Sequence, residues 1–296
     1  MQHQAEQVYR KTAKQMSQAS ETSRVNSKPK ARDDVPFSEL LSFAHDLANL
    51  SETSVLKYFR KHTAVENKSQ RGFDPVTEAD KAAERIIAKT LKSRFPDHSL
   101  TGEEFGHVNG SSPYRWVIDP IDAARAFIMG SPLWGTLIGL LDGDTPVLGL
   151  MNQPFTGERY WAGEKASYMR LRDGKPQRIR TRACPRLADA ILTTTHPDLF
   201  ERGHQQDVHK ALGRSVRMTR YGGDCYHFAL LASGLIDAVF EAGVKSYDVV
   251  ALIPIIERAG GCMTAWDGGR AINGGNVIAT GDPRLHEAAL KLISRA

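Results

Sequence analysis

The chain has 296 residues, of which 41% are hydrophobic and 25% charged, enough for one large α/β domain or two closely packed halves. This composition excludes a disordered, collagen-like or disulfide-rich chain. The apolar stretches at residues 137–141 and 249–256 are far shorter than the ~20 residues that span a bilayer, so we expect no membrane segment. The three cysteines are scattered and show neither zinc-ligand nor redox spacing, which favours a reducing compartment, the cytoplasm.

The net charge of +5 comes from one end of the chain. Residues 1–32 carry seven basic and two acidic residues, whereas residues 33–296 carry 32 of each sign. A neutral body argues against a nucleic-acid partner, because polyanion binding needs an excess of positive charge. A basic nucleic-acid-binding protein is therefore only the third hypothesis, and it depends on the basic residues of the tail.

Residues 1–35 are predicted to be a flexible basic tail, rich in Gln, Ser, Lys and Thr and poor in large apolar residues. An organelle-targeting peptide is the alternative for this segment, which lacks the apolar core of a secretory signal. Residues 36–296 are predicted to form the folded domain, with a possible boundary between lobes near residues 180–190.

The first half of the domain alternates helices with hairpins. Apolar residues repeat with helical spacing over 37–60, and a second helix is expected over 78–95, started by Thr77 and stopped by Pro96. A buried strand at 116–119 ends on an acid. Further strands are expected to pair in two hairpins, 134–141 with 147–151 and 160–162 with 167–171.

The second half of the domain also mixes helices with strands. Helices are expected at 224–233 and 247–259, each ending at glycine, with a strand at 236–241 between them. A strand at 276–280 then precedes a helix that begins near Pro283. Hairpins mixed with helices indicate an α+β fold of stacked layers and not a regular βαβ repeat.

Acidic residues recur where these elements begin or end: Asp74 and Asp80, Glu103 and Glu104, Asp119 and Asp122, and Asp248. Each alone has an ordinary explanation as a first-turn helix charge, a solvated loop, a turn residue or a helix cap. Together they suggest a shared site. Like charges about 4 Å apart repel by roughly 4 kcal/mol at an effective dielectric near 20, so convergence requires protons or cations. All-oxygen ligands favour Mg²⁺ or Mn²⁺ over zinc, with phosphate oxygens sharing the coordination.

These motifs, in this order, resemble the inositol monophosphatase family over about residues 37–296. The resemblance rests on Asp-Pro-Val-Thr-Glu-Ala-Asp (74–80), Gly-Glu-Glu (102–104), Trp-Val-Ile-Asp-Pro-Ile-Asp (116–122) and Tyr-Asp (247–248) followed by Gly-Gly (260–261). The segments 102–106, 134–136, 221–225 and 247–254 resemble its histidinol-phosphatase-like branch more narrowly.

The resemblance implies a layered αβαβα sandwich that is commonly a homodimer. It also implies an enzyme that hydrolyses a phosphomonoester by in-line attack of water. It implies two or three Mg²⁺ ions (Mn²⁺ as the alternative), held by side chains and one backbone carbonyl: Glu103, Asp119, Asp122, Asp248 and the carbonyl of Ile121. Asp80 would take the proton from the attacking water, or position a third ion, and Glu103 would share in catalysis. The backbone N–H groups of Ala123 and Ala124 would meet the phosphate, and Asp224 and Glu241 would lie beside the leaving group.

The sequence departs from the family at one point, where Asp122-Ala123-Ala124 replaces Asp-Gly-Thr. The family threonine pairs with the acid that corresponds to Asp80, and the loss of a proton-transfer partner typically costs about 10²–10⁴ in rate. Alanine in place of glycine strains the turn if its φ is positive. Three interpretations fit: a weakened phosphatase, a relative that binds without hydrolysing, and a deliberately inactivated variant.

The leading hypothesis is a Mg²⁺-dependent phosphomonoesterase acting on a small phosphorylated metabolite. Histidinol phosphate, an intermediate of histidine biosynthesis, is the first choice because its amine and imidazolium would suit Asp224 and Glu241. Inositol monophosphate and nucleotide 3′-phosphates come next. The alternative is a catalytically silent protein that binds metal and phosphoesters. For Asp224, a plain role as the N-cap of helix 224–233 is a further alternative.

Overall fold

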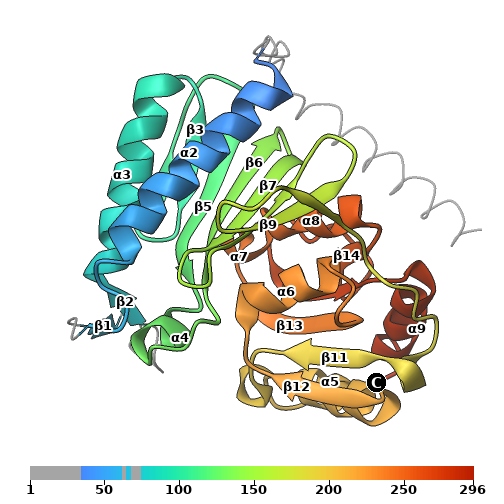
Figure 1. The fold of residues 1–296 in the computed structure, drawn as a ribbon. Coiled ribbons are helices and arrows are strands. Elements are labelled where there is room, and N and C mark those ends of the chain that lie inside the picture. The colour runs from blue at the N-terminus through green and yellow to red at the C-terminus, as the bar shows by residue number, and fades with distance from the viewer. Residues whose placement is uncertain (1–34, 62–64, 68–74) are drawn as a thin grey trace, which may run out of the picture. The chain divides into compact units, whose positions relative to one another are not determined.

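The computed structural model describes residues 35–61, 65–67 and 75–296 (Figure 1). Asp74 and the predicted tail, apart from Val35, lie outside the described residues. The described residues cluster as one compact unit. Within the described ranges, no helix is both long and apolar enough to cross a membrane.

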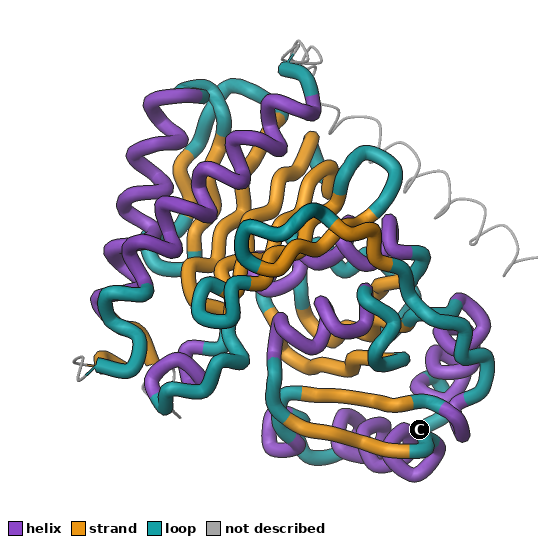
Figure 2. Tube along the Cα trace, viewed as in Figure 1, coloured by secondary structure: helices purple, strands orange, loops and turns teal. Residues whose placement is uncertain are grey.

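The domain has five layers, three of helices and two of sheet (Figures 1 and 2). Helices supply the first, third and fifth layers: α2 (Phe37–Val55) with α3 (Glu78–Arg94), α6 (Asp224–Ala232) with α8 (Leu252–Ala259), and α5 (His204–Ser215) with α9 (Pro283–Ile293). The predicted αβαβα sandwich is therefore confirmed. Two shorter helices, α4 (Ala124–Ile128) and α7 (Ser246–Val249), border the functional cavity described below.

The first sheet has eight strands. In spatial order they are β10 (Gln177–Ile179), β9 (Ser167–Leu171), β8 (Glu158–Ala162), β7 (Thr145–Gln153), β6 (Gly135–Asp142), β5 (Tyr114–Asp122), β3 (Ser99–Gly102) and β4 (His107–Val108). Only β3 and β5 pair in parallel. Both predicted hairpins are confirmed, as β6 with β7 and as β8 with β9. A separate pair, β1 (Val65–Asn67) and β2 (Pro75–Thr77), precedes α3.

The second sheet has five strands and mixes parallel with antiparallel pairs. In spatial order they are β12 (Met218–Tyr221), β11 (Ile191–Thr194), β13 (Ala238–Val244), β15 (Gly275–Thr280) and β14 (Cys262–Ala265). The segment 180–190 connects the two sheets and contains the short 3₁₀ helix η1 (Leu187–Asp189); a second, η2 (Pro197–Leu199), follows β11.

The helix ends follow local chemistry. The Thr77 hydroxyl accepts a hydrogen bond from the Ala79 N–H and starts α3 as predicted. Helix α2 ends at Val55, five residues before the predicted end at 60. The chain leaves the helix there in turns, which bring Phe59 into tilted ring contacts with Phe127 and Trp134. Burying that ring outweighs continuing the helix.

The predicted helix 247–259 is interrupted: the structure divides it into α7 and α8, although Val250 and Ala251 between them keep right-handed helical dihedrals. Pro254 lacks an N–H and cannot donate to the Val250 carbonyl, so the hydrogen-bond ladder is interrupted at the junction. The paired glycines Gly139 and Gly149 let this junction approach the sheet. A Cβ at Gly149 would lie 1.9 Å from the Ala251 carbonyl oxygen. The close approach brings Asp248, on α7, beside β5.

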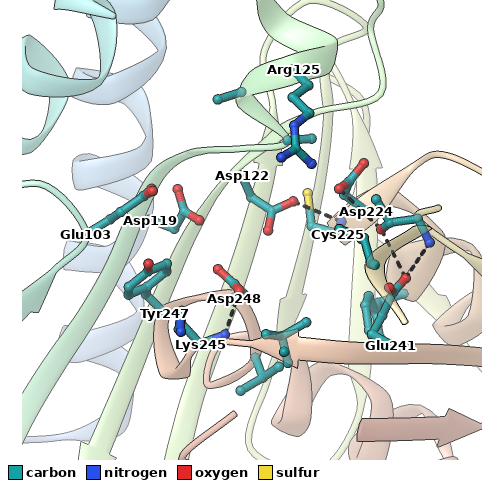
Figure 3. A pocket seen from close by; sticks show the side chains of 18 of the residues that line it. Glu103, Asp119, Asp122, Arg125, Asp224, Cys225, Glu241, Lys245, Tyr247 and Asp248 are labelled. Carbon is teal, nitrogen blue, oxygen red and sulfur yellow. Dashed lines mark hydrogen bonds between the residues drawn. The ribbon is translucent and has the colours of Figure 1, made fainter. Parts of the chain in front are cut away.

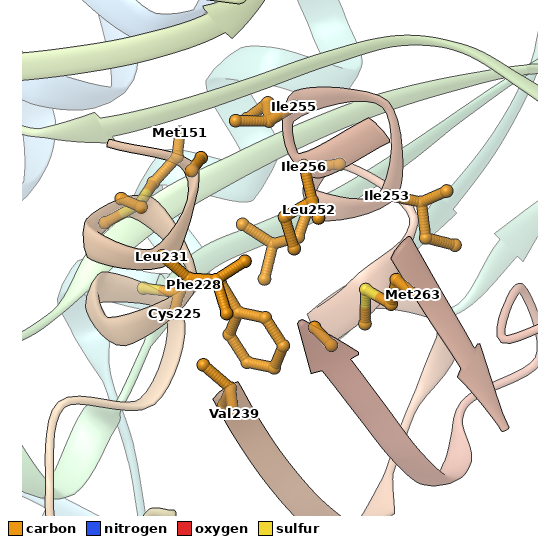
Figure 4. Packing of buried hydrophobic residues seen from close by; sticks show 14 of the residues in the cluster. Met151, Cys225, Phe228, Leu231, Val239, Leu252, Ile253, Ile255, Ile256 and Met263 are labelled. Carbon is orange, nitrogen blue, oxygen red and sulfur yellow. The ribbon is translucent and has the colours of Figure 1, made fainter. Parts of the chain in front are cut away.

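The largest core lies between the two sheets, where α6 and α8 bury their apolar side chains (Figure 4). Phe228 and Leu231 of α6 meet Leu252 and Ile256 of α8 in this cluster. Burying side chains of this size contributes about 1.5–3 kcal/mol each. This packing fixes the first residues of α6 opposite the end of β5, where the acidic side chains gather.

Candidate active site

A cavity of about 330 Å³ opens between the end of β5, α4, α6, β13 and α7 (Figure 3). Its carboxylates come from five separate segments of the chain: Glu103, Asp119 and Asp122, Asp224, Glu241, and Asp248. Arg125 and Lys245 are the basic residues of its described lining. We call this space the acidic cavity.

Asp119, Asp122 and Asp248 form its centre, and we call them the acidic cluster. Each offers a carboxylate oxygen, and these oxygens all lie within 4.8 Å of one another. Backbone N–H groups hold the three side chains: Ile121 donates to Asp119 at 3.0 Å, Cys225 to Asp122 at 3.0 Å, and Lys245 to Asp248 at 2.7 Å. The fold itself therefore positions the carboxylates against their mutual repulsion.

Burial and mutual repulsion perturb the acidic cluster. Burial is the main cause that raises the pKa of Asp119 and of Asp122 well above the ordinary range, followed by Glu103 for Asp119 and by Asp248 for Asp122. Burial also raises the pKa of Asp248 to about 7. The group is stable only when protonated or when cations lie among the oxygens. An all-carboxylate donor set of this spacing fits Mg²⁺ or Mn²⁺.

Glu103 lies outside the tight cluster but beside it, close enough for its carboxyl to share a hydrogen bond with Asp119. The loop that carries it is fastened by Glu84, a fully buried residue of α3 that we did not predict. The carboxylate of Glu84 accepts hydrogen bonds from the backbone N–H groups of Glu104 and Phe105, at 2.8 and 2.9 Å. A Cβ at Gly102 would lie 1.9 Å from Glu84 Oε1, so only glycine fits there. The position of Glu84, one helical turn after Asp80, was the available sequence signal.

Asp80 is buried in the first turn of α3 and does not line the acidic cavity. Its Oδ2 accepts hydrogen bonds from the Thr77 N–H at 2.8 Å and from the Thr77 hydroxyl at 2.7 Å. Burial raises its pKa to about 6, with smaller contributions from Glu104 and Glu103. Asp80 thus has the first-turn position weighed for it and also closes a capping box with Thr77, and Asp248 caps α7 as weighed for it. Asp80 lies near the Glu103 loop.

The turn after Asp122 is strained. Ala123 has φ 70° and ψ 48°, the left-handed region that glycine adopts without cost. A residue with a Cβ pays about 1–2 kcal/mol there. Ala124 is the first residue of α4, and both alanines line the cavity. Since the first N–H groups of a helix have no acceptor within it, they are available to an anion.

Glu241 and Asp224 form the other end of the cavity, and we call them the acidic pair. Thr195 donates to Glu241 from its N–H at 2.8 Å and from its hydroxyl at 3.0 Å, and that hydroxyl lies 3.2 Å from Asp224 Oδ1. Burial, then Asp224, raises the pKa of Glu241 to about 8. Burial also raises the pKa of Asp224. The N-cap of α6 is Gly223 and Asp224 makes no capping bond, so the N-cap alternative for Asp224 is wrong.

Three lining residues were missed from the sequence. Arg125 follows the turn and points toward Asp122 and Asp224 (Figure 3). Thr195 follows β11, and the N–H of Cys225 donates to Asp122. The β-branched residues Ile191, Thr193 and Thr194 were the signal for a strand that ends just before Thr195.

Comparisons with known proteins agree with this geometry. A family model described as the inositol monophosphatase family matches residues 37–296. The bifunctional phosphatase IMPL2, chloroplastic, of Arabidopsis thaliana is 39% identical over 280 residues, covering 90% of this chain and 78% of its own length. A histidinol-phosphatase of Streptomyces coelicolor is 34% identical, covering 86% and 97%. The structure of an inositol monophosphatase from Zymomonas mobilis superposes with a TM-score of 0.77 at 36% identity, covering 88% and 99%.

Proposed function

The chain belongs to the inositol monophosphatase family, and from this premise we propose a Mg²⁺-dependent phosphomonoesterase whose first-choice substrate is histidinol phosphate. Members of the family are metal-dependent phosphomonoester hydrolases. Inositol monophosphate is the second choice. The observation that carries the proposal is that one cavity joins the acidic cluster to a second, separate acidic pair.

The metal site would use the acidic cluster together with Glu103 and the carbonyl of Ile121. The donors fit two or three Mg²⁺ ions, with Mn²⁺ as the alternative, because hard cations prefer oxygen ligands. Bound ions would supply positive charge to the phosphate and lower the pKa of a coordinated water. The chain positions these donors in advance, since each carboxylate of the cluster is already held by a backbone N–H.

The phosphate would lie against the turn at Ala123 and Ala124, which line the cavity and begin α4. Asp80 would accept the proton of the attacking water or help to hold a third ion, from its place near the Glu103 loop. Ala124 offers no hydroxyl to orient that water. We therefore propose that the turn limits the rate of hydrolysis.

The acidic pair would recognise the leaving group. The carboxyl groups of buried Glu241 and half-buried Asp224 favour a substrate that carries positive charge, and histidinol phosphate has both an amine and an imidazole ring. Inositol offers neutral hydroxyls and would leave Asp224 and Glu241 without an opposite charge. The histidinol-phosphatase relatives support this choice.

A catalytically silent relative that binds metal and phosphoesters is the second candidate. Two observations favour it, the strained φ of Ala123 and the absence of a hydroxyl at Ala124. Metal and phosphate binding would survive both changes, because the acidic cluster does not depend on them.

Phosphate release from histidinol phosphate, inositol 1-phosphate and a nucleotide 3′-phosphate, each with Mg²⁺ and with a chelator, tests the proposal. We expect Mg²⁺-dependent release with the highest kcat/KM on histidinol phosphate. Preference for inositol 1-phosphate would overturn the substrate choice. Calorimetric binding of histidinol phosphate without any release would select the silent relative.

The homodimer and the cytoplasmic location stay predictions. Sedimentation equilibrium of the purified chain, run with and without Mg²⁺, checks the first. A fluorescent fusion of the full chain checks the second, and its accumulation in an organelle would favour the targeting-peptide alternative for residues 1–35.

A further inference from the structure

A second cavity, of about 290 Å³, shares no lining residue with the acidic cavity. It lies between α2 and the strands β7, β8 and β9, and polar side chains dominate its lining: Asn49, Glu52, Asn152, Arg159, Arg170, Arg172 and Asp173. We call it the arginine pocket, because three arginines line it from β8, β9 and the turn after β9.

The sheet register places like charges side by side. Arg159 of β8 and Arg170 of β9 are direct partners across an antiparallel pair. Their side chains therefore point to the same face of the sheet. Like charges in directly opposed positions destabilise a sheet unless an opposite charge lies with them. Without an opposite charge beside them, the paired arginines therefore destabilise the sheet.

Arg159 is buried, with 3% of its surface exposed, and its guanidinium is fixed by neutral acceptors. Its Nε donates to Asn152 Oδ1 at 2.7 Å, and one Nη donates to Asn49 Oδ1 at 2.9 Å. The nearest acid, Glu52, lies 3.6 Å away and leaves 38% of its side chain exposed. The buried cation is thus oriented by amides and only partly neutralised.

The same excess of positive charge lowers the pKa values of Arg159 and of its neighbour His45. Burial, followed by the repulsion of Arg170, lowers the pKa of Arg159 to about 10, and the attraction of Glu52 is the weaker effect. Burial together with Arg159 and Arg170 lowers the pKa of His45 to about 4. Among the described residues, the side chains of Arg170 and Arg172 make no hydrogen bond or ion pair.

We propose that the arginine pocket binds a small oxyanion, a phosphate or a carboxylate. The planar guanidinium groups offer paired N–H donors that match the oxygens of such a ligand. An anion between Arg159 and Arg170 would turn their repulsion into two charge-assisted contacts. The site is independent of the proposed phosphatase, because none of its residues lines the acidic cavity.

Calorimetry on the metal-free full chain, with inorganic phosphate and with malonate as probes, tests the site. Without metal, the acidic cavity repels anions, so the heat reports on the arginine pocket. We expect binding that Arg170→Gln/Arg172→Gln weakens at least about tenfold. The matched control is Arg178→Gln/Arg180→Gln, which removes the same charge from exposed positions outside the pocket and should change the affinity less than about twofold.

Equal weakening in both double variants would overturn the proposal, because it would show attraction to net charge alone. Tighter binding of malonate than of phosphate identifies a carboxylate ligand, and the reverse identifies a phosphate. The pocket can also be filled by an acidic side chain of a second copy of this chain. In that case the wild type takes up neither probe and Arg170→Gln/Arg172→Gln reduces its association in sedimentation, a result that would reject the small-ligand site.

Discussion

The acidic cavity and the arginine pocket each gather like charges, but they differ in burial and in what holds the charges. The acidic cluster places three carboxylates within 4.8 Å of one another, each fixed by a backbone N–H. In the arginine pocket, Arg159 is the buried arginine, and side-chain amides fix it. Burial decides how strongly a charged group requires a counter-charge, because water screens exposed groups.

The two sites differ in how strongly each depends on its ligand. The acidic cluster has a large electrostatic penalty that only protons or cations relieve, so its ligand should affect the stability of the whole domain. The arginine pocket has Glu52 nearby and solvent at Arg172, so its ligand should bind weakly and leave stability little changed.

The turn beside the acidic cluster should govern turnover. Ala123→Gly combined with Ala124→Thr restores a residue suited to positive φ and adds the missing hydroxyl. We expect kcat on histidinol phosphate to rise about 10²–10⁴-fold, roughly 3–5 kcal/mol of transition-state stabilisation, with little change in Mg²⁺ affinity. Steady-state kinetics of the double variant and of Ala124→Thr alone provide the measurement. An unchanged rate would show that the water is activated in another way.

Metal removal should make the stability of the domain depend on pH. The raised pKa values mean that the folded chain keeps protons on the acidic cluster that the unfolded chain has released above pH ~4. Stability of the metal-free protein should therefore fall as pH rises from about 4 to 7, by about 3 kcal/mol. Asp282, whose pKa Arg284 lowers to about 2, titrates below this window.

Urea unfolding at pH 5 and pH 7, with Mg²⁺ and with NaCl at equal ionic strength, measures this effect. Mg²⁺ should remove the part of the loss that comes from the acidic cluster, because bound ions keep its carboxylates ionised in the folded state. Asp80 and Glu241, with pKa values raised to about 6 and about 8, do not belong to the cluster, so the slope that they cause should remain with both salts. The same slope with both salts would mean that the cluster does not bind Mg²⁺.

Loss of one carboxylate should weaken metal binding. Asp119→Asn keeps the size of the side chain and removes one negative charge from the acidic cluster. We expect the affinity for Mg²⁺ or Mn²⁺ to fall about 100-fold, or about 2.7 kcal/mol. The matched control is Asp144→Asn, in the exposed turn between β6 and β7, which should bind metal as the wild type does. Normal metal binding by Asp119→Asn, measured by calorimetry, would show that the site is misassigned.

The acidic pair should set selectivity more than turnover. Asp224→Asn should lower kcat/KM for histidinol phosphate about tenfold more than for inositol 1-phosphate, since only the first carries a cation for the pair. Glu241→Gln should act in the same direction. The ratio of the two substrates within each variant serves as its own control. Equal losses on both substrates would remove the specificity role.

Much of this arrangement could be predicted from the sequence, for reasons that differ between elements. Helical periodicity revealed α2, Thr77 and Pro96 marked the ends of α3, and the Asp-Gly-Asp turn at 142–144 revealed the hairpin of β6 and β7. The acids at element ends indicated a shared site through their positions along the chain. The four-residue strands β3, β11, β12 and β14 were missed, because their stability comes from partners far along the chain.

The supporting residues were harder to predict. Glu84 acts through backbone N–H groups of a loop about twenty residues away, and its position one helical turn after Asp80 indicates a shared helix face but not that contact. The arginine pocket depends on the register that sets Arg159 opposite Arg170, which periodicity alone does not determine. The break between α7 and α8 had a visible signal in Pro254, which cannot donate a helical hydrogen bond.

The smallest expected effect separates the backbone strain of Ala123 from the lack of a hydroxyl at Ala124. Ala123→Gly alone relieves a left-handed alanine, worth about 1–2 kcal/mol, but gives the unfolded chain more freedom, which costs about 0.4–1 kcal/mol. We expect a net gain of up to about 1 kcal/mol in the free energy of unfolding, measured with urea in the presence of Mg²⁺. Ala126→Gly, in the same short helix but without positive φ, should instead lose about 1 kcal/mol. A loss in both variants would show that Ala123 is not strained, and the rate gain of the double variant would then belong to the hydroxyl that Ala124→Thr introduces.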